Sequence, residues 1–116
     1  KRRSLMMKTK TKAFRSKKHL KEVSEMPCCV NDFSCGGEVQ AHHLLKPWRG
    51  ERGMGMKASD DNVIPLCQYH HSVLHDRVGN EFKFFVKYGR KETFGQELAR
   101  KLYEEFEERN GSSAAL

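Results

Sequence analysis

The sequence predicts a small α+β domain built around a strand–strand–helix unit that carries metal-binding side chains. Polar and apolar residues alternate over Glu38–His42, which is typical of a short strand. The apolar run Asn62–Leu66 predicts a second strand, antiparallel to the first, and Gln68–Asp76 then has histidines at helical spacing. Five of the six histidines lie between Gln40 and His75, so we expect this unit to hold the functional site.

The composition limits the chain to one small domain. Of its 116 residues, 37% are hydrophobic and 32% are charged, so the buried interior must be small. Domains with so thin a core often use a bound metal for stability. No apolar segment approaches the ~20 residues that cross a bilayer, and no secretory segment is visible. We therefore expect a cytoplasmic protein that does not contact a membrane.

Basic charge is concentrated at the N-terminus. The net charge is +7, and residues 1–21 contain ten Lys or Arg and no acid, whereas the rest has fifteen acidic residues against twelve basic ones. We interpret residues 1–18 as a flexible basic arm, residues 19–109 as the folded domain and residues 110–116 as a flexible tail. Two interpretations of the arm remain open: it binds a polyanion such as DNA, or it is a solvated tail that keeps the protein soluble.

Helix signals predict the remaining elements. A short helix is expected around residues 19–23 and is stopped by Pro27. Asn80–Tyr88 is expected to be a helix with Gly89 as its C-terminal stop. A last helix, Thr93–Arg109, is expected to open with a capping box. Its core-facing stripe recurs every four residues, at Phe94, Leu98, Leu102 and Phe106.

The cysteines are spaced as ligands of a structural zinc ion. Cys28 and Cys35 flank a polar loop followed by two glycines, which resembles a zinc knuckle with a stretched turn. Cys67 and His70 follow at C-x2-H spacing and complete a Cys3His set suited to closed, tetrahedral zinc. Cys29 is the substitute ligand or a packing residue. Disulfides and buried packing cysteines are the alternatives, but the interleaved histidines favour zinc and a reducing compartment.

The histidines form a second candidate set. His71 and His75 are four residues apart, so both project from one face of the expected helix. His42, at the end of the first strand, supplies a third imidazole, and an open set of this kind suits a catalytic divalent metal. His43 is then left unligated, and an imidazole that titrates near about pH 6.5 can take a proton from water. Asn62 can hydrogen-bond across the hairpin and orient the His43 segment.

A long loop, residues 44–61, joins the two expected strands. Loops of this length in a small domain are usually functional or disordered. Four basic side chains in it are candidate nucleic-acid contacts: Lys46, Arg49, Arg52 and Lys57. Two interpretations remain open, namely a surface that tracks phosphates, or a solvated loop whose Trp48 folds onto the core.

These residues resemble the HNH endonuclease superfamily, which has a ββα-metal motif. The likeness rests on His42-His43, on the run Asn62-Val63-Ile64-Pro65-Leu66-Cys67, and on His70, His71 and His75. More narrowly, the chain is similar to small phage-type HNH nucleases, such as phage recombination-enhancement nucleases, at His19, Pro27-Cys28, Ala41, Gly53-Met54-Gly55, Lys57 and Asp60. The resemblance covers residues 20–102 and is strongest between His42 and His75.

The resemblance implies a small ββα-metal (HNH) core with extra helices, and an enzyme that nicks or cuts DNA in a bacterial or phage-infected cell. It implies that His43 activates water and that Asn62 positions His43. One catalytic divalent metal is implied on His42, His71 and His75: Mg²⁺, Mn²⁺ or a similar ion, with Zn²⁺ or Ni²⁺ in the isolated protein. One structural Zn²⁺ is implied on the Cys3His set. A larger phage or host partner protein is a further possibility, and the oligomeric state is left open.

The sequence departs from the commonest pattern of that superfamily in three ways. The first metal ligand is His42 where Asp is usual, His70 replaces a cysteine of the second CxxC, and the first CxxC is stretched. Imidazole ligands favour zinc over Mg²⁺, so the working metal is open. The alternative function is a non-catalytic, zinc-stabilised DNA-binding module in which every histidine is structural.

Overall fold

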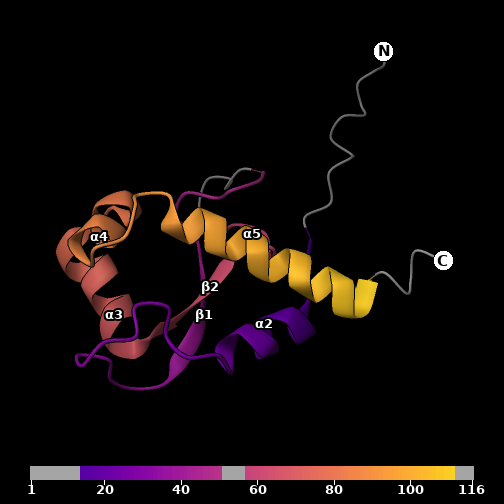
Figure 1. Cartoon of the computed structure of the whole chain (residues 1–116), viewed down its shortest axis with the longest axis horizontal. Helices are drawn as coiled ribbons and strands as arrows, with labels where there is room; N and C mark the ends of the chain where they lie inside the picture. Colours follow the sequence, from indigo (N-terminus) through magenta and orange to yellow (C-terminus); the bar gives the residue numbers. More distant parts are fainter. Residues whose placement is uncertain (1–13, 51–56, 112–116) are drawn as a thin grey trace, which may run out of the picture.

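The α+β prediction is confirmed: a two-stranded sheet is flanked by helices. The computed structural model describes residues 14–50 and 57–111. In chain order the elements are α2 (Lys17–Ser24), β1 (Val39–His43), β2 (Val63–Cys67), α3 (Gln68–Ser72), the π-helical η1 (Val73–Val78), α4 (Glu81–Lys87), α5 (Phe94–Phe106) and the π-helical η2 (Glu107–Gly111). Figure 1 shows α3 and α4 at one end of the molecule, with α5 running above α2.

The two strands form an antiparallel hairpin. His42 lies opposite Ile64 and His43 lies opposite Val63. Each strand begins and ends one residue later than the sequence predicts. Pro65 cannot donate a ladder hydrogen bond, and it lies, as predicted, in an edge strand. Its carbonyl accepts a hydrogen bond from the Cys29 amide at 2.9 Å, so the segment before β1 covers this edge of β2.

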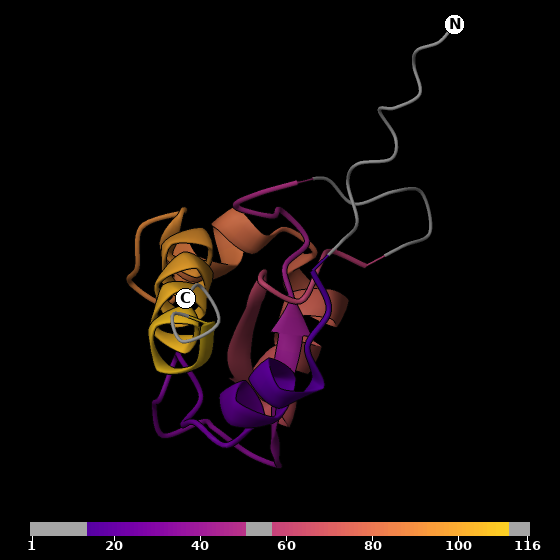
Figure 2. The ribbon, with the colours of Figure 1, turned by 90° about the vertical axis from the view of Figure 1, so that its right-hand side faces the viewer.

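The core lies between the sheet and the helices. α2 contacts both strands, and α5 contacts β2 and α4. Figure 2, which looks along α5, shows that helix on one side of the strands. The largest buried apolar side chains are Leu44, Ile64, Leu66, Leu74, Phe84 and Phe85. Among the described residues, no helix combines the length and the apolar character that a membrane crossing requires.

The boundaries of the folded part differ from those that the sequence predicts. α2 begins at Lys17, and its N-cap Ser16 accepts a hydrogen bond from the His19 amide at 3.1 Å. The Phe14 carbonyl accepts one from the Asp60 amide at 2.9 Å. Residues 14–18 therefore belong to the domain and not to the arm. η2 extends the last helix to Gly111, two residues beyond the predicted end. Residues 1–13 and 112–116 lie outside the described residues.

The two C-terminal helices follow the predicted pattern with one exception. Asn80 caps α4 by accepting from the Lys83 amide, and Gly89 adopts a left-handed φ of 78° just beyond its end. The capping box predicted at the start of α5 is wrong. The Gln96 side chain instead donates to the Lys46 carbonyl at 3.0 Å, which ties α5 to the loop after β1. Thr93 donates its hydroxyl to the exposed side chain of Glu97.

His19 is a buried histidine on α2. Its ring centroid lies 4.8 Å from that of Phe106, 6.3 Å from that of Tyr103 and 6.5 Å from that of Phe14. The residue is 1% exposed, and within the described part of the chain neither of its ring nitrogens has a hydrogen-bond partner. Burial lowers the pKa of His19 below its ordinary value of 6.5, because a charged imidazole is poorly solvated among these rings.

Replacing His19 is expected to make the protein less sensitive to acid. Below about pH 6.5 the unfolded chain takes up a proton that folded His19 resists, so the stability that neutral His19 contributes is present above this pH and is lost as the pH falls. The charged groups that act on the ring are Glu22, Asp60, Asp61 and Arg109. As the pH is lowered from about 7.5 to 5.5, the free energy of unfolding measured in urea should fall more steeply for wild type than for His19→Leu. The difference in slope should reach up to about 1.4 kcal/mol per pH unit. Parallel pH curves for the two proteins would contradict this account.

Candidate functional site

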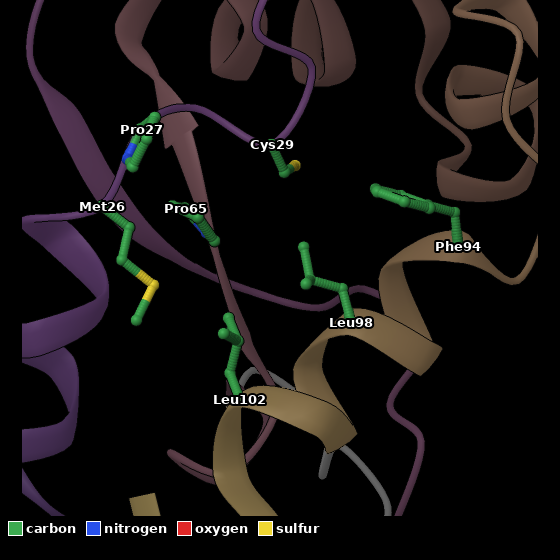
Figure 3. A pocket seen from close by; sticks show the side chains of 7 residues that line it. All are labelled: Met26, Pro27, Cys29, Pro65, Phe94, Leu98 and Leu102. Atoms are coloured by element: carbon green, nitrogen blue, oxygen red, sulfur yellow. The ribbon is translucent and has the colours of Figure 1, made fainter. Parts of the chain in front are cut away.

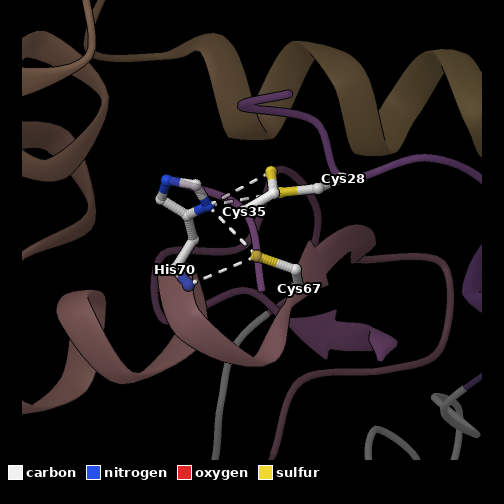
Figure 4. A group of neighbouring side chains, drawn as sticks. All are labelled: Cys28, Cys35, Cys67 and His70. Atoms are coloured by element: carbon white, nitrogen blue, oxygen red, sulfur yellow. Dashed lines mark hydrogen bonds between the residues drawn. The ribbon is translucent and has the colours of Figure 1, made fainter. Parts of the chain in front are cut away.

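Four side chains converge at the start of α3 as a candidate zinc site. Figure 4 shows the sulfurs of Cys28, Cys35 and Cys67 gathered on one side of the His70 ring, where they face one ring nitrogen. His70 Nδ1 lies 3.7 Å from Cys28 Sγ, 3.6 Å from Cys35 Sγ and 3.1 Å from Cys67 Sγ. With Zn–S near 2.3 Å and Zn–N near 2.0–2.1 Å, a tetrahedral site has a sulfur-to-nitrogen edge of about 3.6 Å. This cluster, which the sequence predicted, is therefore placed so that it could hold a zinc ion.

The second nitrogen of His70 is held by the knuckle loop. His70 Nε2 lies 3.1 Å from Ser34 Oγ and 3.3 Å from Asp32 Oδ1. Asp32 in turn accepts hydrogen bonds from the amide and hydroxyl of Ser34, at 2.9 and 2.6 Å. Partners of this kind fix the orientation and tautomer of a ligating histidine, so Nδ1 faces the sulfurs.

Cys67 caps α3 and belongs to the cluster at the same time. Its sulfur accepts a hydrogen bond from the His70 amide at 3.4 Å. Burial alone raises the pKa of this thiol, but hydrogen bonds from the His70 and Gly36 amides lower it to about 6 overall. The thiolate is the metal-binding form, so the backbone prepares Cys67 as a ligand. Gly37, which follows Gly36 in the chain, has a φ of 80°, and a Cβ there would collide with the Gln68 side chain, so this position favours glycine.

Cys29 lies outside the cluster, and this resolves the choice between the two neighbouring cysteines. Burial raises the pKa of its thiol to about 12. As Figure 3 shows, Cys29 lines an apolar pocket between β2, α5 and the segment after α2. The other residues that line it are Met26, Pro27, Pro65, Phe94, Leu98 and Leu102. Cys29 is therefore a packing residue, and Cys28 supplies the candidate ligand.

The second predicted set also converges. His42 comes from β1, His71 from α3 and His75 from η1, and their candidate ligand atoms lie within 4.8 Å of one another. The ring centroids are 4.4 Å apart for His71 and His75, and 5.1 and 5.6 Å from that of His42. Burial and the two neighbouring rings lower the pKa of His71, which favours the neutral imidazole that metals bind. We call these three residues the imidazole cluster. His42 is buried and His75 is exposed, so the cluster reaches the surface.

Sequence reasoning missed the buried carboxylate beside this cluster. His42 Nε2 lies 2.8 Å from Glu81 Oε2. Glu81 also accepts hydrogen bonds from the Leu45 and Lys46 amides at 2.7 and 2.8 Å. Thirty-nine positions separate it from His42, and an acid in the first turn of a helix is ordinarily read as a surface residue. No local pattern in the sequence therefore points to it.

His43 faces a different partner from that of His42. Its Nε2 lies 2.8 Å from Asp60 Oδ1, and its side chain is 15% exposed. A proton on Nε2, assigned from this contact, leaves a lone pair on Nδ1. Burial lowers the pKa of His43, and Asp60 opposes that shift. The positive charges of Lys57 and Arg15 act in the same direction as burial.

Asp60 joins His43 to the start of the folded chain. Its carboxylate accepts hydrogen bonds from the Ser16 amide at 2.9 Å and from Arg15 Nη1 at 3.1 Å. Burial raises the pKa of Asp60, but these contacts and the one with His43 hold it below the ordinary value. In the sequence Asp60 stood out only as part of the resemblance to phage-type nucleases, and its contact with His43 was not predicted.

The predicted role of Asn62 needs correction. Its side chain accepts from the Trp48 amide at 2.7 Å and donates to the Arg49 carbonyl at 3.1 Å. Only its backbone carbonyl reaches across the hairpin next to His43, where it accepts from the Leu44 amide at 2.9 Å. Asn62 therefore holds the loop after β1, and the side chain that contacts His43 is that of Asp60.

The structure separates the four predicted nucleic-acid contacts. Arg49 has partners within the protein, because its guanidinium donates to Asp61 Oδ2 at 2.8 Å and stacks on the rings of Trp48 and Tyr103. Lys46 Nζ lies 5.1 Å from the centroid of the Phe82 ring. Lys57 is exposed, whereas Arg52 lies outside the described residues. Trp48 packs against the core, as the second interpretation of the loop expects, and the phosphate-tracking surface stays a prediction.

The fold and these side chains define a small α+β protein with two candidate metal sites on one strand–strand–helix unit. The chain belongs to the family described as "Protein of unknown function (DUF968)", which matches it over residues 2–105. It is also 37% identical, over 83 residues and 70% of its length, to the "Uncharacterized protein YdfU" of Escherichia coli (strain K12). The chain spans only 22% of that relative's length. No solved structure matches the chain significantly.

The two adjacent cysteines give a matched test of the zinc site. Cys28→Ser is expected to lose the tightly held zinc ion and at least ~3 kcal/mol of unfolding free energy, because metal binding to such a site is coupled to folding. Cys29→Ser should retain the ion, since its thiol lies in the apolar pocket. Zinc content after dialysis against a chelator, together with thermal unfolding, measures both effects. Equal zinc loss in the two variants would contradict the assignment.

Proposed function

We propose that this protein is a metal-dependent endonuclease of the HNH type that hydrolyses phosphodiester bonds in DNA. One observation carries the proposal. The imidazole cluster includes His42, whereas the next residue, His43, is outside the cluster and contacts Asp60, and a separate closed Cys3His cluster stands at the start of the helix that carries His71. A protein that needs only one zinc ion for stability has no use for the second cluster.

The residues of the imidazole cluster fit a catalytic divalent metal. They offer three neutral nitrogen ligands, and the fourth position of such a site is left to water or substrate. When bound there, a divalent ion supplies Lewis-acid stabilisation of phosphate charge and of the leaving oxygen. The exposed position of His75 leaves the cluster accessible to a large polyanion. Imidazole ligands favour Ni²⁺ and Zn²⁺ over Mg²⁺, so the metal should be tested as a series.

His43 is the general base in this proposal. Asp60 accepts from Nε2 and fixes the ring, which leaves Nδ1 to take a proton from the attacking water. Asp60 is itself held by Ser16 and Arg15, so the orientation of the base depends on the first residues of the folded chain. This arrangement parallels the His–Asp pairs in which a carboxylate orients the catalytic imidazole.

The cations nearest His43 support a polyanionic substrate. Lys57 is exposed, and Arg15 keeps 42% of its side chain exposed even though it contacts Asp60. Both positive charges act on the His43 ring. Phosphate contacts of this kind position a nucleic acid without reading its sequence, so we expect weak sequence preference and strong salt dependence.

Removal of the base should stop cleavage and leave binding intact. His43→Ala is expected to lower the rate of plasmid nicking by about 10²–10⁴-fold, while DNA affinity and the thermal unfolding midpoint stay near those of wild type. Gln40→Ala, an exposed position on the same strand, is the matched control and should nick normally. The assay is run with Mg²⁺, Mn²⁺, Ni²⁺ and Zn²⁺.

Each outcome of the nicking assay separates the hypotheses. Full nicking by His43→Ala would overturn the assignment of the base. If wild type binds DNA but nicks it with none of the four metals, the non-catalytic zinc-stabilised DNA-binding module is the correct interpretation. Metal content gives an independent check, because the nuclease proposal expects one ion that survives chelation and a second that exchanges.

Two basic residues of the same loop should respond differently to substitution. Lys57→Gln is expected to reduce the slope of log affinity against log salt for DNA binding by about 0.9, the effect of one lost phosphate contact. Arg49→Gln should leave that slope unchanged and reduce the unfolding free energy by about 1–3 kcal/mol, because buried Asp61 loses its charged partner and keeps only the donors of Ser59 and Asn62. DNA-binding titrations at several salt concentrations and urea unfolding measure the two effects. A reduced salt slope for Arg49→Gln together with an unchanged slope for Lys57→Gln would contradict these assignments.

A further inference from the structure

We infer that Glu81 is a positioning residue for the imidazole cluster, which fixes the ring of His42 and thereby sets how tightly the cluster holds a divalent metal. The catalytic meaning of this inference rests on the proposed nuclease function. Its central claim concerns metal affinity, which can be measured whether or not the protein cuts DNA.

Among the described residues, Glu81 is one of three buried acids, with Asp60 and Asp61, and it is the one that contacts His42. Its side chain is 3% exposed, although carboxylates are almost never buried without a partner. Its Oε1 accepts from the Lys46 amide, and its Oε2 accepts from the Leu45 amide. The same Oε2 lies 2.8 Å from His42 Nε2. The two amides anchor the carboxylate to the turn that follows β1, and the anchored carboxylate holds the imidazole.

The contact with Glu81 determines which nitrogen of His42 is available. A carboxylate oxygen that already accepts from an amide attracts the N–H tautomer of Nε2, so Nδ1 is left with its lone pair. The rings of His71 and His75 lie close by, with centroids 5.1 and 5.6 Å from that of His42. Carboxylate–histidine pairs beside metals act in this way, and their loss typically weakens metal binding 10–100-fold.

The position of Glu81 in the fold explains why the contact is rigid. It is the first residue of α4, and Asn80 caps that helix immediately before it. Phe84 and Phe85 of α4 are buried in the core, so the backbone that carries Glu81 cannot shift without repacking. Glu81 therefore transmits the placement of α4 to a side chain on β1, across 39 positions of sequence.

The experiment measures Zn²⁺ affinity of the imidazole cluster in the full chain already loaded with one zinc equivalent, by competition with a chromophoric chelator. Glu81→Gln is expected to weaken the second Zn²⁺ by 10–100-fold, since the amide keeps one accepting oxygen for the three donors of Glu81 and loses the negative charge. Glu97→Gln is the matched control, because Glu97 is an acid in the first turn of α5 whose partners are exposed. It should leave both affinities unchanged.

A double-mutant cycle distinguishes positioning from a general structural effect. If Glu81 acts through His42, Glu81→Gln should have little further effect on Zn²⁺ affinity in a His42→Ala background, but its full effect in a His71→Ala background. Equal effects in both backgrounds, or a change below about twofold in the otherwise unaltered protein, would overturn the inference.

Two further measurements keep the inference testable under every outcome. If Glu81→Gln fails to fold, as judged by circular dichroism and loss of the first zinc, the His42 tautomer is determined by NMR in the wild-type protein without the second metal. A proton on Nε2 supports the inference and a proton on Nδ1 overturns it. If the variant weakens Zn²⁺ binding but wild type nicks no DNA, the inference stands and the nuclease proposal fails. If wild type nicks DNA but Glu81→Gln binds the second Zn²⁺ as tightly as wild type, the nuclease proposal stands and the inference about Glu81 fails.

Discussion

The phase of the helix that starts at Gln68 is the constraint on which the rest of the site depends. Cys67 ends β2, caps α3 and points its sulfur into the Cys3His cluster, so one side chain fixes both the first turn of the helix and its rotation. Successive helical residues are rotated by about 100°. Once His70 faces the sulfurs, His71 and His75 must project from another side of the helix, where they meet His42. The two clusters thus share one helix without sharing a ligand.

The adjacent histidines on β1, His42 and His43, also contact different partners. Successive side chains on a strand point to opposite faces, and here His42 and His43 meet different carboxylates. Glu81 holds the first and Asp60 the second, each at 2.8 Å. Each carboxylate is anchored by backbone amides, at Leu45 and Lys46 for Glu81 and at Ser16 for Asp60. The proposed roles of metal ligand and base would therefore fall to adjacent residues, each fixed by a different remote segment.

A small core explains why so many polar contacts lie in the interior. Little apolar surface is available to hold the described ends of the loop between β1 and β2, and polar groups hold them instead. Asn62 binds the loop backbone at Trp48 and Arg49, and the Arg49 side chain is held between two aromatic rings and Asp61. Gln96 of α5 ties the same loop from the other side. Through Lys46, whose amide donates to Glu81, the contact of Gln96 is connected to the carboxylate that holds His42.

Much of this arrangement follows from sequence alone, because it depends on local spacing. The strand period and the glycine after α4 predicted the bounds of the elements to within a residue or two. The C-x2-H and i, i+4 spacings predicted the two candidate ligand sets. Tertiary structure decided what depends on segments far apart. It selected Cys28 over Cys29, turned Asn62 toward the loop, engaged Arg49 with Asp61, and brought Glu81 and Asp60 to the two histidines. Residue spacing indicates which side chains share one face of a helix or strand. Which residues that face contacts depends on the packing between elements, because local periodicity contains no information about distant segments.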